Sequence, residues 1–228
     1  MKNILLVRHL ESTKNLSLQF SASESKESLT ERAKKEGLVL GKNIAEFVKV
    51  TNLKVKNVYS ADSNRALETA KFISNALELP VIVSSNLCSS SMGIMQGKSE
   101  DEVKQICPLF IKQLKLWEVG LYNSYEFEKL EGRESKELME NRVMNAIDNI
   151  FNIEDEELKI IVLHTSSLNA TLINLARRFY NFPRDFWTSP VSNYGGIYWV
   201  ELKEKNDEFS FKGLNISSEQ LLEMAYSL

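Results

Sequence analysis

The chain has 228 residues, enough for one large domain or two small ones with a sizeable core. Its apolar and charged fractions are those of an ordinary soluble protein, and its net charge of −3 gives no electrostatic reason to expect nucleic acid or an anionic membrane as partner. No stretch is long enough to span a bilayer, and the apolar run after Lys2 is too short for a signal peptide. Cys88 and Cys107 fit no metal or redox spacing, so we expect a reduced, cytoplasmic location.

The first predicted element is a strand over residues 4–7, followed directly by a cation and an imidazole, Arg8 and His9. Its unbroken apolar run is typical of a strand buried on both faces, as in a parallel sheet. Such strands present functional residues at their carboxyl ends. The second of the two histidines, His164, follows a similar run over residues 158–163. We therefore predict that the two histidines share one site.

Arg8, next to His9, indicates which class of ligand the site would bind. Two histidines could bind a metal, but a third ligand would be needed, and no His-x-x-x-His, Cys-x-x-Cys or Glu-x-x-His spacing supplies it. A guanidinium opposes a cation and suits an anion, most simply phosphate. We expect an oxyanion site that needs neither a metal nor an organic cofactor.

The next elements continue the alternation of helix and strand. A serine-rich loop over residues 15–28 leads to the capping-box pattern Ser28-x-x-Glu31, which predicts a helix to about residue 50. A second strand is expected over residues 55–59, and Arg65 then falls in the first turn of another helix, whose N-terminus favours an anion. The alternative for Arg65 is a solvated surface position.

The middle of the chain predicts an insertion over the site. After a third strand at residues 80–84, Ser99-x-x-Glu102 predicts a helix start and Pro108 an interruption. We interpret residues 96–132 as a cap, although their acidic and aromatic character also fits a solvated connector. Ser135 should cap the helix that runs to Phe151.

The last third of the chain predicts one more helix after His164, broken by residues 181–183. Two strands follow over residues 197–202 and 209–214, with a turn at residues 206–207, and Ser217-x-x-Gln220 starts a final helix. The whole pattern predicts a single α/β domain over residues 1–228. It should have three layers, with a mainly parallel sheet flanked by helices on both faces.

These motifs resemble the histidine phosphatase superfamily, its cofactor-dependent phosphoglycerate mutase-like group. The resembling segments are Arg8-His9-Leu10-Glu11-Ser12 with Asn15, the Ser-x-Asp-x-x-Arg-Ala-x-x-Thr-Ala pattern around Arg65, and His164. The resemblance covers most of the chain and implies a phosphoglycerate mutase-like fold.

The resemblance also implies a role for each matching residue. His9 would attack phosphorus and form a phosphohistidine, while Arg8, Arg65 and His164 would neutralise the phosphoryl oxygens. Asn15 would add a neutral donor, and water would then release phosphate. No metal is required, because the arginines supply the positive charge.

Three positions depart from the family pattern. Leu10 and Thr165 stand where the family has glycine, and we expect their side chains to narrow the pocket. Ser89 stands where the family has the glutamate that protonates the leaving group. With Asn15, Ser89 and Thr165 are the expected substrate-binding positions. A relocated acid would have to come from the cap, with Glu118, Glu126 or Glu128 as candidates.

Three functions are compatible with this pattern. We favour a phosphatase acting on a small phosphorylated molecule. A phosphoglycerate mutase ranks lower, because nothing in the sequence shows how a bisphosphate would be held against water. The departures at Ser89, Leu10 and Thr165 leave a non-catalytic phosphate-binding or interaction protein as a further alternative. The oligomeric state is open, with a homodimer among the options.

Overall fold

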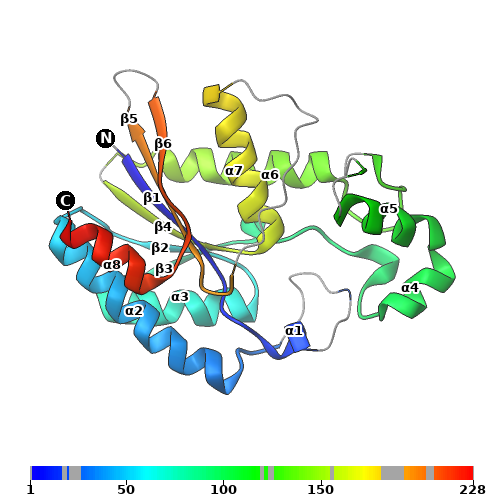
Figure 1. Cartoon of the computed structure of the whole chain (residues 1–228), viewed down its shortest axis with the longest axis horizontal. Helices are drawn as coiled ribbons and strands as arrows, with labels where there is room; N and C mark the ends of the chain where they lie inside the picture. Colours follow the sequence, from blue (N-terminus) through cyan, green and yellow to red (C-terminus); the bar gives the residue numbers. More distant parts are fainter. Residues whose placement is uncertain are drawn as a thin grey trace.

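A computed structural model describes residues 2–16, 20, 27–118, 121–122, 126–154, 157–180, 193–203 and 208–227. Within these ranges the chain forms a six-stranded sheet with helices on both faces (Figure 1). The predicted three-layer α/β fold is therefore confirmed. The expected helix break at residues 181–183, the turn at residues 206–207 and most of the serine-rich loop lie outside the described residues.

The sheet places the two histidine-bearing strands side by side. In spatial order its strands are β3 (Val81–Ser84), β2 (Val58–Ala61), β4 (Leu158–Leu163), β1 (Lys2–Arg8), β5 (Ile197–Lys203) and β6 (Glu208–Ile216). The first four strands in this order run parallel, whereas β5 pairs with β1, and β6 with β5, in antiparallel fashion. Every residue of β4 and the five middle residues of β1 are buried, which explains their unbroken apolar runs.

Helices cover both faces of this sheet. One face carries α2 (Glu31–Thr51), α3 (Asn64–Leu77) and α8 (Ser218–Tyr226), and the other carries α6 (Lys136–Phe151) and α7 (Thr165–Tyr180) (Figure 1). The apolar stripe of α2 is buried at Leu40, Ile44 and Phe47, as its helical spacing predicts. No helix in the described part of the chain combines the length and the apolar character needed to cross a membrane.

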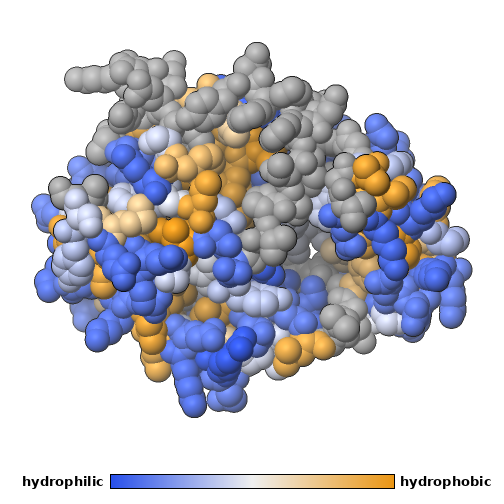
Figure 2. Space-filling view, viewed as in Figure 1, coloured by the Kyte–Doolittle hydropathy of each residue, from blue (hydrophilic) through white to orange (hydrophobic). Residues whose placement is uncertain are grey.

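A second, smaller core lies in the region predicted as a cap. It belongs to α4 (Glu100–Ile106) and α5 (Pro108–Glu118), and its buried members are Met95, Val103, Cys107, Phe110 and Ile111. We call residues 92–118 with residues 126–133 the α4–α5 unit. It lies beyond the short α1 (Thr13–Leu16), on the side toward which β1 runs (Figure 1). The surface shown in Figure 2 is largely hydrophilic over α2, while the α4–α5 unit also exposes apolar groups such as Ile106 and Leu109.

Most predicted helix starts are confirmed, and one is wrong. Ser99 with Glu102, Ser135, and Ser217 with Gln220 cap α4, α6 and α8, and α5 begins at Pro108. The first long helix begins at Glu31 and is capped by Thr30, whose hydroxyl accepts the Ala33 N–H at 3.1 Å. Ser28 is not the cap, because it lies two residues before Thr30, and its backbone carbonyl accepts the Thr13 N–H.

The second strand also starts later than predicted, at Val58. The preceding segment is tied to the start of β4, where the Lys54 carbonyl accepts the N–H groups of Glu157 and Leu158. Only from Val58 onward does the backbone align with Ile160 of β4 and Val81 of β3. Hydrophobicity over residues 55–59 therefore indicated the strand but not its first residue.

Candidate active site

The topology brings His9 and His164 to the same edge of the sheet. Arg8 and Leu163, the last residues of β1 and β4, are register partners, and the His9 N–H donates to the Leu163 carbonyl at 3.0 Å. The two imidazole centroids are 5.0 Å apart and the rings meet edge to face at 63°. Both side chains are at most 4% exposed. Two residues separated by 155 positions in sequence thus form one buried imidazole pair.

The His9 ring is fixed in one tautomer by its own neighbour. Nδ1 lies 2.7 Å from the Leu10 carbonyl oxygen, which can only accept, so Nδ1 carries the hydrogen. Nε2 then has a lone pair, and it accepts a hydrogen bond from Arg65 Nε at 3.3 Å. Arg65 is 2% exposed and lies in the first turn of α3, where the helix N-terminus faces the histidine pair.

Burial and positive neighbours keep both imidazoles neutral. Burial lowers the pKa of His9 well below its ordinary value of 6.5, and the Arg65 charge lowers it further. The pKa of His164 is lowered in the same direction, first by burial and then by His9 and Arg65. A neutral imidazole, which keeps a lone pair on one ring nitrogen, is the form that can act as a nucleophile.

Arg8 is held near His9 by an aromatic residue, Tyr194. Its Cζ lies 4.0 Å from the centroid of the Tyr194 ring, which is itself 6.0 Å from the His9 ring. The backbone of Arg8 is tied to the same turn, because its N–H donates to the Gly196 carbonyl and its carbonyl accepts the Gly195 N–H. The sequence marked Asn193-Tyr194-Gly195-Gly196 only as a turn, so this contact of Tyr194 was missed.

Asn15 and Lys14 approach the site from α1. The side-chain oxygen of Asn15 accepts from the backbone N–H and the hydroxyl of Ser12, at 2.9 and 2.8 Å, so its amide NH₂ is the end that can donate to a ligand. Burial, followed by the nearby charges of Arg65 and Arg8, lowers the pKa of Lys14 to about 8. Lys14 was missed in sequence, although a lysine beside Asn15 is the signal that could have found it.

Positive groups therefore converge on the neutral imidazole pair. Burial lowers the pKa of both Arg8 and Arg65, and the charge of each lowers the pKa of Lys14. Cations that repel one another at low exposure are stabilised by an anion placed between them. Among the described residues, no group of three or more His, Cys, Asp or Glu side chains could hold a metal ion. The arrangement is chemically suited to a phosphoryl or similar oxyanion.

Comparison with known proteins agrees with this chemistry. Residues 4–216 match the family model of the histidine phosphatase superfamily, branch 1. The chain belongs to the histidine phosphatase superfamily. No curated protein sequence matches it.

Several solved structures share the fold of this chain at low sequence identity. YhfR of Bacillus stearothermophilus is 20% identical with a TM-score of 0.77, covering 96% of this chain and 99% of that one. A mycobacterial glucosyl-3-phosphoglycerate phosphatase in complex with VO3 is 16% identical with a TM-score of 0.74, covering 95% and 100%. A putative alpha-ribazole-5'-P phosphatase of Escherichia coli is 15% identical with a TM-score of 0.69, covering 95% and 98%. Membership of the superfamily and neighbours named as phosphatases support a phosphatase-type function.

Ser89, which the sequence motifs predict at the position of the superfamily glutamate, lies on a loop held by Arg142 of α6. Arg142 Nη2 donates to the Ser89 carbonyl at 3.0 Å, and Nη1 donates to the carbonyls of Asn86 and Cys88 at 2.9 and 2.8 Å. Its Nε and Nη2 also bind Glu134 in a bidentate pair, both at 2.7 Å. All five N–H groups of the guanidinium are thereby used, so the backbone around Ser89 is fixed.

The three candidates for a relocated acid belong to the α4–α5 unit. The Glu128 N–H donates to Gln113 of α5 at 2.8 Å, the Glu126 carbonyl accepts from the Tyr122 hydroxyl at 3.1 Å, and Glu118 ends α5. No contact in the described part of the chain joins any of these glutamates to the histidine pair.

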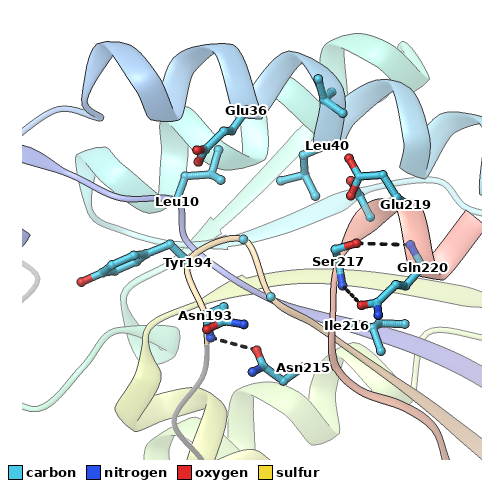
Figure 3. A pocket seen from close by; sticks show the side chains of 14 residues that line it. Leu10, Glu36, Leu40, Asn193, Tyr194, Asn215, Ile216, Ser217, Glu219 and Gln220 are labelled. Atoms are coloured by element: carbon cyan, nitrogen blue, oxygen red, sulfur yellow. Dashed lines mark hydrogen bonds between the residues drawn. The ribbon is translucent and has the colours of Figure 1, made fainter.

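The expectation that Leu10 narrows the phosphate pocket is wrong. Leu10 is 3% exposed and belongs to the main hydrophobic core. Its side chain points toward Leu40 and lines a cavity of about 310 Å³ between α2 and α8, whereas the Tyr194 ring points the other way (Figure 3). Its φ is not positive, so a side chain is accommodated here without backbone strain.

Thr165, the other expected substitute for glycine, is the first residue of α7 and directly follows His164. It is half-buried. It therefore remains a candidate for narrowing the pocket. His164 itself contacts Ser63, which caps α3 and which the sequence motif included without suggesting a role.

Proposed function

We propose that this protein is a phosphatase that hydrolyses a small phosphorylated substrate through a phosphohistidine at His9. The observation that carries the proposal is the state of the His9 ring. The Leu10 carbonyl holds the hydrogen on Nδ1, and burial beside Arg65 keeps the imidazole neutral, so Nε2 has a lone pair at the centre of the cation cluster.

The first step would be in-line attack of His9 Nε2 on phosphorus, forming the N–P bond as the bond to the leaving oxygen breaks. Arg65 now donates to Nε2 over a long 3.3 Å contact, and phosphoryl oxygens would draw that guanidinium away from the nitrogen. Arg8 and Arg65 would balance the charge on the equatorial oxygens, with Asn15 and His164 as neutral donors. Because these cations supply the positive charge, no step calls for a metal.

In the second step, water would attack the phosphohistidine. The N–P bond breaks, inorganic phosphate leaves, and His9 returns to its neutral form. Lys14 adds a further cation to the same site. The similar structures are named after phosphate esters of small molecules, glucosyl-3-phosphoglycerate and alpha-ribazole-5'-P, which supports a small phosphoester as the substrate class.

Ser89 is the observation that favours a second candidate. A serine hydroxyl is far too weak an acid to replace a carboxylic acid, and the Arg142 clamp fixes the Ser89 backbone. A protein that binds phosphate without turning over an ester would follow if no other donor reaches the leaving group. A phosphoglycerate mutase ranks below both, because it must protect a bisphosphate from water.

Turnover of a panel of alkyl, aryl and acyl phosphates, combined with trapping of the phosphoenzyme, tests the proposal. We expect radiolabelled acetyl phosphate to leave acid-labile, base-stable label on the wild type and none on His9→Gln. Lys71→Ala, a change on the exposed side of α3, is the matched control and should label like the wild type. Equal turnover in His9→Gln would contradict the mechanism, and phosphate binding without any turnover would favour the binding protein.

A further inference from the structure

Ser63, which is not part of the proposed cation cluster, contacts the second histidine, His164. Among the described residues this is the only hydrogen bond of the His164 side chain. Ser63 Oγ lies 3.1 Å from His164 Nε2, and both side chains are at most 4% exposed. Ser63 is also the N-cap of α3, and its hydroxyl oxygen accepts the Ala66 N–H at 3.4 Å. The other ring nitrogen, His164 Nδ1, is buried and has no hydrogen-bond partner among the described residues.

The contact between Ser63 and His164 can form with either group as the donor, and the number of buried polar groups left without a partner distinguishes the two arrangements. In the first, the Ser63 hydroxyl donates to Nε2, so the ring hydrogen of His164 lies on Nδ1. In the second, Nε2–H donates to Ser63, and the hydroxyl hydrogen then needs another acceptor. The described structure offers the Ser63 side chain contacts only with His164 and Ala66, and Ala66 is itself a donor. The first arrangement leaves one buried polar group without a partner, and the second leaves two.

We propose that Ser63 is a positioning residue that keeps His164 in the Nδ1–H tautomer, so that the neutral imidazole donates to a bound oxyanion. Because Ser63 occupies Nε2, Nδ1 is the ring nitrogen that remains for a ligand. With its hydrogen it donates to a phosphoryl oxygen, whereas a lone pair on Nδ1 would repel that oxygen. The low pKa of His164 makes the tautomer decisive, since a protonated ring would donate from both nitrogens.

The tautomer can be measured directly, because the chain has only two histidines. Long-range ¹H–¹⁵N correlation spectra of the imidazoles should show two ring patterns, both Nδ1–H in the wild type. Ser63→Ala should shift the His164 pattern toward Nε2–H and leave the His9 pattern unchanged. Ser63→Thr keeps a hydroxyl and should keep the wild-type pattern. Ser135→Ala removes the N-cap of α6 instead and controls for the loss of a cap.

The affinity for inorganic phosphate then tests whether the Nδ1–H of His164 donates to a bound oxyanion. This part of the proposal rests on the proposed anion site and not on turnover. We expect Ser63→Ala to bind phosphate about tenfold more weakly, as the loss of one neutral hydrogen bond implies. Ser63→Thr and Ser135→Ala should bind like the wild type. Unchanged affinity despite a shifted tautomer would overturn the role in anion binding.

The wild-type spectrum alone can refute the tautomer assignment. An Nε2–H pattern for His164 would do so, even if Ser63→Ala failed to fold. A wild type that turns over no ester, although Ser63→Ala shifts the tautomer and weakens phosphate binding as expected, would count against the proposed function and not against Ser63. The two proposals are thus tested by separate readouts.

Discussion

The burial of both histidines predicts a loss of stability in mild acid. Each has a folded-state pKa well below 6.5, so below that pH the unfolded chain binds protons that the folded chain does not. The free energy of unfolding should therefore fall as the pH falls. For one histidine that stays neutral in the folded state, the loss between about pH 7.5 and 5.5 is about 1.4 kcal/mol, and for two it is about 2.7 kcal/mol.

Urea denaturation at the two pH values, in buffer without phosphate, measures this loss. Phosphate must be absent because a bound ligand would stabilise the folded state by itself. Ordinary carboxylates titrate mostly below this window, but the buried Lys136, whose pKa is lowered to about 7 by burial, titrates within it and adds a loss in the same direction. His9→Gln and His164→Gln should each reduce the wild-type loss by about 1.4 kcal/mol, and the double variant by about 2.7 kcal/mol. A wild-type free energy of unfolding that stays constant between the two pH values would refute the reasoning.

Three further predictions concern single side chains. Arg65→Ala should weaken vanadate binding by about 1.5–3 kcal/mol, the loss of a charge-assisted hydrogen bond, whereas exposed Lys71→Ala should not; equal affinities in a titration would remove Arg65 from the site. Leu10→Ala should lower the free energy of unfolding by about 2–5 kcal/mol and leave the range of accepted substrates unchanged; a wider range would place Leu10 back in the phosphate pocket. Ser89→Glu should raise alkyl phosphate turnover by up to about 10²–10⁴-fold; an unchanged rate would mean that the position does not reach the leaving group.

The histidine pair could be predicted from sequence because two local signals coincide. Buried parallel strands read as unbroken apolar runs, and the carboxyl ends of parallel strands meet at one edge. His9 and His164 each follow such a run, and β1 and β4 prove to be neighbours. Arg65 was predictable for a similar local reason, because a capped helix places its first turn at that edge.

The contacts that the sequence missed depend on strand order, which periodicity does not encode. Ser63 reaches His164 because β2 lies beside β4, and Tyr194 reaches Arg8 because β5 pairs with β1. The Leu10 prediction failed because a glycine in a family pattern does not say where a replacing side chain would point. Here the side chain enters the core between α2 and the turn at Gly195.

The contacts of Arg142 bear on the prediction that Ser89 replaces a glutamic acid. The loop that carries Ser89 is held through three carbonyls by a guanidinium that is itself paired with Glu134, so its backbone is fixed. In the proposed mechanism Arg8 and Arg65 stabilise charge on the phosphoryl group but supply no proton to a departing alkoxide. Phenolates and carboxylates depart largely without a proton. If the proposed phosphatase has no relocated acid, its rate should depend steeply on the leaving-group pKa and favour aryl and acyl phosphates. A shallow dependence in the wild type would show that an acid reaches the leaving group from elsewhere, and Lys14, which lies in the site with its pKa lowered to about 8, would then be the first candidate.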